Sequence, residues 1–305
     1  MPPLLNCINF AKAHAGVFAR GMCMGAADLV PGVSGGTVAF ITGIYGRLLS
    51  ALGAFSSPRM IAEIFRGDFA AAWRRGGGAF LPVLLAGIGA AILLLGGALH
   101  YLLREHAALL LAFFCGLVVA SAFAAARQLR TPQRRHIAAG MCGAAFAFAA
   151  VSFAPPVLEP SLPAIFIGGG VAICAMLLPG ISGSYILLIF GLYGHILDAL
   201  RGAQFSILLV FAAGCAAGLL LFTRLLLFLL RRFHDGMTAF LIGVMFGALP
   251  KLWPWKESVV GVKVILQPDV LPVGAADCPQ PPAAAVTGGL LVWALHAAAN
   301  RAPPE

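Results

Sequence analysis

A short glycine-rich motif occurs twice in this chain, each time inside an apolar stretch. Pro31-Gly-Val-Ser-Gly-Gly-Thr37 recurs as Pro179-Gly-Ile-Ser-Gly-Ser-Tyr185, and the alignment continues without a gap to Leu52 and Leu200. The proline and glycine of each copy break an α-helix. Broken helices at matching places in the two halves of an apolar chain indicate a transporter built from two repeats, with its binding site at the breaks.

The composition is that of a membrane protein. Hydrophobic residues make up 61% of the 305 residues and charged residues only 10%. Apolar runs such as 80–103, 107–126 and 205–230 reach the ~20 residues that a bilayer-spanning helix needs. The net charge of +9 does not indicate nucleic-acid binding, because the basic residues stand at the ends of apolar runs, where they set topology. We expect an all-α polytopic membrane protein.

The motif copies divide this one membrane domain into two repeats, 1–154 and 155–305. A second match, 86–91 with 213–218, shows that the first repeat carries extra residues, which fall in 53–78. The predicted elements of the first repeat are a re-entrant hairpin 16–52, an amphipathic surface helix ~57–75 and spans ~79–103, 107–126 and 137–154. Those of the second repeat are a re-entrant hairpin 163–200 and spans ~204–230, 237–250 and 284–299, with 251–283 as an external loop.

We predict that each motif segment enters the membrane and leaves on the same side. Its arms, about 16–30 and 35–52 or 163–178 and 183–200, are short for a full crossing. Each repeat then has three spans, so the second repeat is inverted relative to the first. With a cytoplasmic N-terminus, 13 Lys and Arg residues lie inside and 5 outside, against 12 and 6 if both segments cross fully.

The two helix breaks are candidate anion sites. New half-helices start near Ser34 and Ser182, and a helix N-terminus presents free N–H groups and a positive dipole end. Inside a bilayer such breaks persist only where protein or a wet cavity covers them. A phosphate-like group suits two facing tips, whereas the alternative is that the turns only let helices pack closely. The predicted contacts are Ser34, Gly35, Gly36, Thr37, Ser182, Gly183 and Ser184.

Asp28 and Arg224 are ionisable residues within apolar segments, which makes them functional candidates. Asp28 is a candidate for binding a coupling proton or Na⁺, with a helix-end cap as the alternative. Arg224 is a candidate partner of Asp28 or ligand of the anion, unless its side chain extends to the membrane surface. The second copy has Met176 where Asp28 aligns, so we expect the first copy to carry the ionisable chemistry and the second to complete the cradle.

Four weaker candidates lie near the hairpin mouths: Arg47 and His195, which are equivalent in the two repeats, and Tyr45 and Tyr193. For Arg47 and His195, placement at the membrane surface explains the sequence as well as a functional role does. The chain has no GxSxG, HExxH or Walker motif, and its seven cysteines are scattered without a CxxC pair. We therefore predict no catalytic residue, no metal and no cofactor beyond a coupling ion.

Both motif regions resemble a bacterial family, the polyprenyl-phosphate (undecaprenyl phosphate) translocases. The resemblance rests on Gly25-Ala-Ala-Asp-Leu-Val-Pro-Gly-Val-Ser-Gly-Gly-Thr37 with Gly43-Ile-Tyr45, and on Leu178-Pro-Gly-Ile-Ser-Gly-Ser184 with Gly191-Leu-Tyr193. It implies that undecaprenyl phosphate returns from the outer to the cytoplasmic leaflet of the inner membrane for reuse in cell-wall synthesis. It also implies that Asp28 and the two motif tips form the translocation site. Arg47 departs from the family, for which we expect an acidic residue.

The residues and the resemblance lead to one hypothesis, alternating access with the phosphate between the tips and the prenyl tail in lipid. The substrate and the bilayer are the expected partners, and the sequence does not set an oligomeric state. Two alternatives stay open: an ion-coupled carrier or channel for a small inorganic anion, and a membrane lipid phosphatase.

Overall fold

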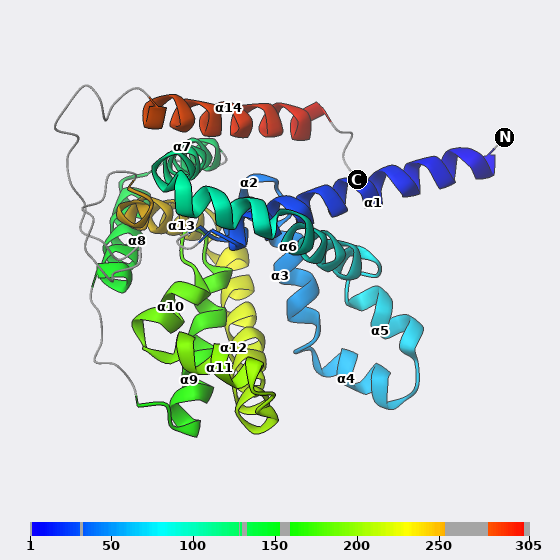
Figure 1. Cartoon of the computed structure of the whole chain (residues 1–305). Helices are drawn as coiled ribbons and strands as arrows, with labels where there is room; N and C mark the ends of the chain where they lie inside the picture. The colour runs from blue at the N-terminus through cyan, green and yellow to red at the C-terminus, as the bar shows by residue number, and fades with distance from the viewer. Residues whose placement is uncertain are drawn as a thin grey trace.

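The computed structural model describes residues 2–30, 33–127, 129, 133–152, 159–253 and 280–301 (Figure 1), and every regular element within them is a helix. This confirms the all-α prediction. The helices of the first half are α1 Pro2–Asp28, α2 Gly35–Ile41, α3 Tyr45–Ala54, α4 Pro58–Phe65, α5 Phe69–Arg75, α6 Phe80–Glu105, α7 Ala107–Ala126 and α8 Arg134–Ser152. Those of the second half are α9 Leu162–Leu177, α10 Gly183–Ile189, α11 Leu192–Arg201, α12 Phe205–Arg232, α13 His234–Gly247, the 3₁₀ turn η1 Leu249–Leu252 and α14 Gln280–Arg301.

Membrane-length helices occur in both halves. Among the described residues, α6, α7, α12 and the stretch from α13 through η1 are long and apolar enough to cross a membrane, which makes four. The number rises to six if the bent pairs α2–α3 and α10–α11 each count as one span. The chain is a multi-pass membrane protein. The prediction that α8 and α14 also cross the membrane stays a prediction. Most of the expected external loop, residues 254–279, lies outside the described residues.

The segment before the first motif is longer than predicted. α1 contains 27 residues, and at a rise of ~1.5 Å per residue it is ~40 Å long. The argument that a short arm precedes the motif is therefore wrong for the first copy. In the second copy α9 contains 16 residues, which is short for a full crossing. The re-entrant course of the motif segments stays a prediction.

The segment after each motif is bent, which corrects the prediction of single arms over 35–52 and 183–200. The axes of α2 and α3 differ by 118°, and those of α10 and α11 by 108°. The bends fall at Gly43 and Gly191, which align in the repeat and share a φ of +74°. This left-handed conformation favours glycine over other residues. The same bend is therefore encoded twice.

The extra residues of the first half form two short helices instead of the single surface helix predicted over ~57–75. α4 and α5 are separated at Gly67, which has a φ of +75°. The Asp68 carboxylate caps α5 by accepting a hydrogen bond from the Ala71 N–H at 3.0 Å. Arg75 donates a 2.8 Å hydrogen bond to Glu63 and joins the two helices. This hydrogen bond holds the pKa of the Glu63 carboxyl below its ordinary value.

Four helix pairs account for most of the interhelical packing: α1 with α6, α9 with α12, α7 with α14, and α8 with α13. The first two pairs are equivalent in the two repeats, and the other two exchange partners between the halves. Glycines allow close approach: a Cβ on Gly116 would overlap the Ala285 carbonyl oxygen. In Figure 1, α9 and α12 run vertically while α1 and α14 run across the view. The inverted relation of the halves stays a prediction.

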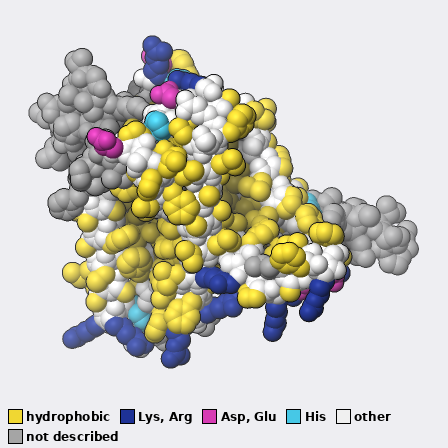
Figure 2. Space-filling view, turned by 90° about the horizontal axis from the view of Figure 1, so that it is seen from below, with side chains coloured by type: hydrophobic (Ala, Val, Ile, Leu, Met, Phe, Trp, Pro, Cys, Tyr) yellow, Lys and Arg dark blue, Asp and Glu magenta, His cyan; other side chains and the backbone are white. Residues whose placement is uncertain are grey.

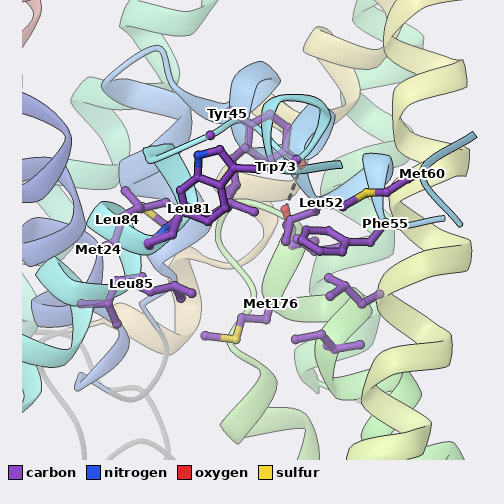
Figure 3. A pocket seen from close by; sticks show the side chains of 18 of the residues that line it. Met24, Tyr45, Leu52, Phe55, Met60, Trp73, Leu81, Leu84, Leu85 and Met176 are labelled. Atoms are coloured by element: carbon purple, nitrogen blue, oxygen red, sulfur yellow. Dashed lines mark hydrogen bonds between the residues drawn. The ribbon is translucent and has the colours of Figure 1, made fainter. Parts of the chain in front are cut away.

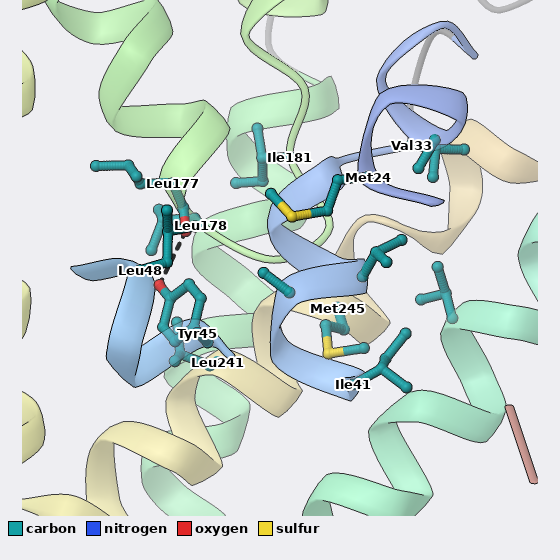
Figure 4. Packing of buried hydrophobic residues seen from close by; sticks show 14 of the residues in the cluster. Met24, Val33, Ile41, Tyr45, Leu48, Leu177, Leu178, Ile181, Leu241 and Met245 are labelled. Atoms are coloured by element: carbon teal, nitrogen blue, oxygen red, sulfur yellow. Dashed lines mark hydrogen bonds between the residues drawn. The ribbon is translucent and has the colours of Figure 1, made fainter. Parts of the chain in front are cut away.

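The largest hydrophobic cluster lies where the two motif regions meet (Figure 4). All but one of the seven residues of α2 are buried, so this short helix sits inside the cluster. The cluster therefore packs the first motif region against the second. Its members, as Figure 4 shows, include Met24, Val33, Ile41, Tyr45, Leu48, Leu177, Leu178, Ile181, Leu241 and Met245.

Candidate functional site

Three hydrogen bonds join the first motif region to the backbone of the second. The Ser34 hydroxyl donates to the Met176 carbonyl oxygen at 3.2 Å. The Tyr45 hydroxyl donates to the Leu177 carbonyl oxygen at 2.8 Å (Figure 4). In the opposite direction, the Gly180 N–H donates to Thr37 Oγ1 at 2.8 Å. The structure thus brings the two tips together, although Pro31 and Gly32 lie outside the described residues.

The backbone N–H groups at the start of α2 are already paired, which differs from the prediction of free donors. The Gly35 N–H donates to Asp28 Oδ1 at 2.7 Å. The Gly36 N–H donates to Ser34 Oγ at 3.1 Å, and the Thr37 N–H to the Ser34 carbonyl oxygen at 2.9 Å. The carboxyl group of the protein's own Asp28 thus occupies the place at this tip that was predicted for an anionic ligand. The cap interpretation of Asp28 therefore describes this conformation.

The start of α10 is arranged differently. Ser182 makes no side-chain cap hydrogen bond to the helix, and its hydroxyl instead lies 2.8 Å from that of Ser184. Ser182 is buried, whereas Ser184 is exposed. Gly183 is buried against α9, since a Cβ there would come within 2.6 Å of the Ala172 carbonyl oxygen. The second tip thus has a hydroxyl pair that is not used in capping.

Arg224 does not lie at the tips. Its guanidinium donates a hydrogen bond to the carbonyl oxygen of Ser56, in the turn between α3 and α4. No ion pair joins it to Asp28 in the described part of the chain, so the predicted Asp28–Arg224 pairing is wrong for this conformation. Arg224 lies instead with Arg231 and Arg232 along a depression on α12.

The four weaker candidates do not form one site. The Arg47 guanidinium stacks 4.5 Å from the centre of the Phe80 ring, at an exposed position. His195 is half-buried, and its Nε2 is the one buried side-chain polar atom of the described residues that has no hydrogen-bond partner. Tyr193 is on the exposed side of α11. Tyr45 joins the tips, through its bond to Leu177.

A cavity of about 780 Å³ opens beside the first tip (Figure 3). Its wall is almost wholly apolar and is built by α1, α3, α4, α5, α6, α12 and the end of α9, with Asp28 and Gly36 among the lining residues. Sequence reasoning missed this wall. The signal was present in the large apolar side chains of the extra segment: Met60, Ile64, Phe69 and Trp73 all line the cavity.

The tips and the cavity define a class of protein. The described residues contain no group of three or more His, Cys, Asp or Glu that could hold a metal ion. What they do contain is a pair of broken helices joined inside a set of membrane-length helices, with one carboxylate at the break. This is the architecture of a multi-pass membrane transporter.

Comparison with known proteins gives the family. A family model described as "Undecaprenyl phosphate translocase-like" matches residues 24–264. A curated "Polyprenyl-phosphate transporter" of Vibrio cholerae serotype O1 is 42% identical over 246 residues, which cover 81% of this chain and 80% of the relative. One of Staphylococcus aureus, with the same description, is 32% identical over 254 residues, covering 77% and 84%. No solved structure matches. The chain belongs to the undecaprenyl phosphate translocase-like family, as its motifs indicate.

Proposed function

We propose that this protein carries undecaprenyl phosphate, a polyprenyl phosphate, from the outer to the cytoplasmic leaflet of the bacterial inner membrane, where the lipid is reused in cell-wall synthesis. The observation that carries the proposal is the joined pair of tips beside an apolar cavity, with Asp28 at the first tip. Such a site combines polar groups for a phosphate with apolar surface for a lipid. The printed names of the two relatives supply the substrate class.

The phosphate binds between the tips in this proposal. The hydroxyls of Ser182 and Ser184 are the first contacts, because they are not used in capping α10. Gly183 and the first-tip residues Ser34, Gly35, Gly36 and Thr37 complete the site. In the predicted topology Arg224, Arg231 and Arg232 lie toward the cytoplasmic side, where they attract the headgroup as it leaves the site.

Asp28 couples this binding to an ion. Its carboxylate accepts the Gly35 N–H, the donor that a phosphate would otherwise use. Two anions repel each other in a low-dielectric site, so the phosphate enters when Asp28 takes up a proton and loses its charge. Binding of Na⁺ to the carboxylate is the alternative form of the same coupling. Tyr45 is the other ionisable side chain among the described residues that line the cavity.

Alternating access follows from the two repeats. The site lies between a broken element of the first half and one of the second. If the halves are inverted repeats with re-entrant tips, rocking one half against the other exposes the site first to one leaflet and then to the other. The substrate leaves chemically unchanged, so the protein is not an enzyme in this proposal.

The test is leaflet-resolved movement of a fluorescent polyprenyl phosphate in proteoliposomes that contain the full-length protein. We expect protein-dependent movement that falls when Ser182 and Ser184 are both replaced by Ala. The matched control is Ser161→Ala, which changes a serine at the far end of α9. Absence of protein-dependent movement contradicts the proposal. Release of inorganic phosphate from the probe favours a lipid phosphatase, and a phosphate current without lipid movement favours an inorganic-anion carrier.

A further inference from the structure

The two halves differ in the segment that connects the bent helices to the next long helix. In the second half, α11 connects to α12 through residues 202–204 alone. In the first half, the α4–α5 segment stands between α3 and α6 and forms a wall of the cavity. Only the first half therefore supplies such a wall, although Met176 and Leu177 of the second half also line the cavity. The wall is the contribution of the extra residues to the site.

The lining of the cavity selects for an apolar chain with one polar end. Leu52, Phe55, Met60, Trp73 and Leu85 supply aliphatic and aromatic surface, whereas Asp28 and Gly36 bring the polar tip to one part of it (Figure 3). A free inorganic anion gains nothing from such walls, because burying a charge without partners is costly. A lipid whose phosphate rests at the tip gains from both parts.

The position of the opening is set by side chains that both line the cavity and face outward. Phe69 and Trp73 of α5 are 69% and 55% exposed, and Leu85 of α6 is 62% exposed. Phe55, Ile64 and Met176 also line the cavity and are 48%, 44% and 37% exposed, so the opening is bounded by α4, α5, α6 and the end of α9. Seen from below, hydrophobic side chains cover most of this face of the molecule, with Lys and Arg gathered along one edge (Figure 2). An apolar opening of this kind suits the hydrocarbon of a bilayer.

We propose that the cavity holds the part of the prenyl chain nearest the phosphate, with the α4–α5 segment as its wall and the rest of the chain passing through this opening into lipid. This assignment rests on the proposed function and changes one expectation, that the whole prenyl tail stays in lipid. The volume of about 780 Å³ lies within the ~300–1,000 Å³ of small-ligand sites. A long polyprenyl chain exceeds it, so only the first isoprene units fit.

The direct test uses farnesyl phosphate with a photoreactive diazirine in its first isoprene unit, added to full-length protein in phosphatidylglycerol vesicles. We expect covalent labelling of peptides from α3, α5 and α6 that line the cavity, and competition by unlabelled farnesyl phosphate. A longer polyprenyl phosphate, with the diazirine at the far end of its chain, should label residues outside the cavity instead. Labelling of the cavity by a diazirine phosphatidylglycerol to the same extent overturns the assignment, because the cavity is then a general lipid site.

Two cavity variants link the assignment to transport. Ala72→Phe fills the cavity from α5, where Ala72 is buried, and Leu85→Trp narrows its opening. We expect each to lower transport about tenfold, the factor that corresponds to losing the burial of about two methylene groups. Leu93→Trp, a similar change on an outward-facing part of α6, is the control.

The outcomes separate the two proposals. Unchanged transport by both variants, or no cavity labelling in a protein that transports, overturns the assignment and leaves the proposed function standing. Cavity labelling in a protein that moves no polyprenyl phosphate overturns the function and supports the assignment. The second variant matters because the larger side chain at Ala72 can also strain the packing.

Discussion

The two motif copies share a backbone but differ in how their polar groups are used. In both, a short helix of seven residues comes after the motif and bends at a glycine with a φ of +74°. In the first copy, Asp28 and Ser34 take up the N–H groups at the start of α2. In the second, Met176 stands in place of Asp28, and Ser182 pairs with Ser184 instead of capping α10.

The comparison separates the shape of the tip from its chemistry. The repeated glycines set the shape twice, whereas the carboxylate is present only in the first copy and the uncapped hydroxyl pair only in the second. The first tip supplies the ionisable group, as expected from the sequence. That the second tip completes the cradle stays a prediction; in the proposed function its two hydroxyls contact the phosphate, because neither is used in capping α10.

The largest expected difference between the copies is in the stability lost when an equivalent glycine, Gly35 or Gly183, is replaced by alanine. A Cβ at Gly183 would lie 2.6 Å from the backbone carbonyl oxygen of Ala172, whereas one at Gly35 would meet the movable carboxylate of Asp28. We expect Gly183→Ala to destabilise the protein by about 2 kcal/mol, the usual cost of overpacking. Gly35→Ala should destabilise less but lower transport, because it displaces Asp28. Thermal unfolding in detergent and the proteoliposome assay measure the two effects, and equal losses of stability would contradict this ranking.

Removing the charge from the first tip tests its chemistry. Asp28→Asn keeps an acceptor for the Gly35 N–H but can neither carry a charge nor take up a proton. We expect transport to fall at least about tenfold, which corresponds to about 1.4 kcal/mol of activation free energy, and to lose its dependence on pH. Asp198→Asn, which removes an exposed carboxylate of α11, should have little effect. If Asp28→Asn transports with the pH dependence of the wild-type protein, coupling through Asp28 is wrong.

The equivalent serines Ser34 and Ser182 should differ by a smaller amount in the stability lost on replacement by alanine. Ser34 is fully buried, caps α2 and donates to the Met176 carbonyl oxygen. Ser34→Ala should cost about 1 kcal/mol, the typical value for a lost helix cap. Ser182→Ala removes only a bond to another hydroxyl and should cost less. The measurement is the unfolding midpoint of each purified variant, and a larger loss in Ser182→Ala would overturn the account of the two tips.

The smallest effect on stability is expected for the Glu63–Arg75 ion pair of the α4–α5 segment, which only the first half has. Arg75 lowers the pKa of Glu63, so the ion pair stabilises the α4–α5 segment above the ordinary pKa of Glu63, and this contribution is lost as the pH falls through the lowered pKa. Because the pair is exposed to solvent, the effect is small. Hydrogen exchange in α4 and α5 should rise slightly in Glu63→Gln at neutral pH. Exchange that is faster across the whole molecule would show that the pair has a wider role.

Much of this arrangement could be predicted from the sequence, because repetition and composition are local signals. Apolar runs and their flanking charges located the membrane-length helices, and the doubled Pro-Gly-x-Ser-Gly located the two breaks. The bends at Gly43 and Gly191 were visible as repeated glycines but not as bends. A glycine shows that a left-handed conformation is available, and only the folded chain shows that it is used.

The rest depended on tertiary contacts. Nothing in the spacing of Asp28 and Gly35 shows that the carboxylate turns back onto that N–H, or that Arg224 contacts Ser56 instead of Asp28. The cavity was missed for a similar reason. The apolar face of the extra segment predicts contact with something apolar, and a membrane surface and a cavity wall leave the same pattern.

The exchanged pairs have a consequence for how the protein is made. α7 is synthesised in the first half, yet its partner α14 is the last helix of the chain, and Gly116 of α7 contacts the backbone at Ala285. α8, in the first half, likewise packs against α13, which is synthesised later. The first half therefore leaves the ribosome with two helix faces still lacking their protein neighbours. α7 and α8 therefore gain their main helix neighbours only when α14 and α13 have been made, and deletion of α14 would expose the face of α7 that it covers.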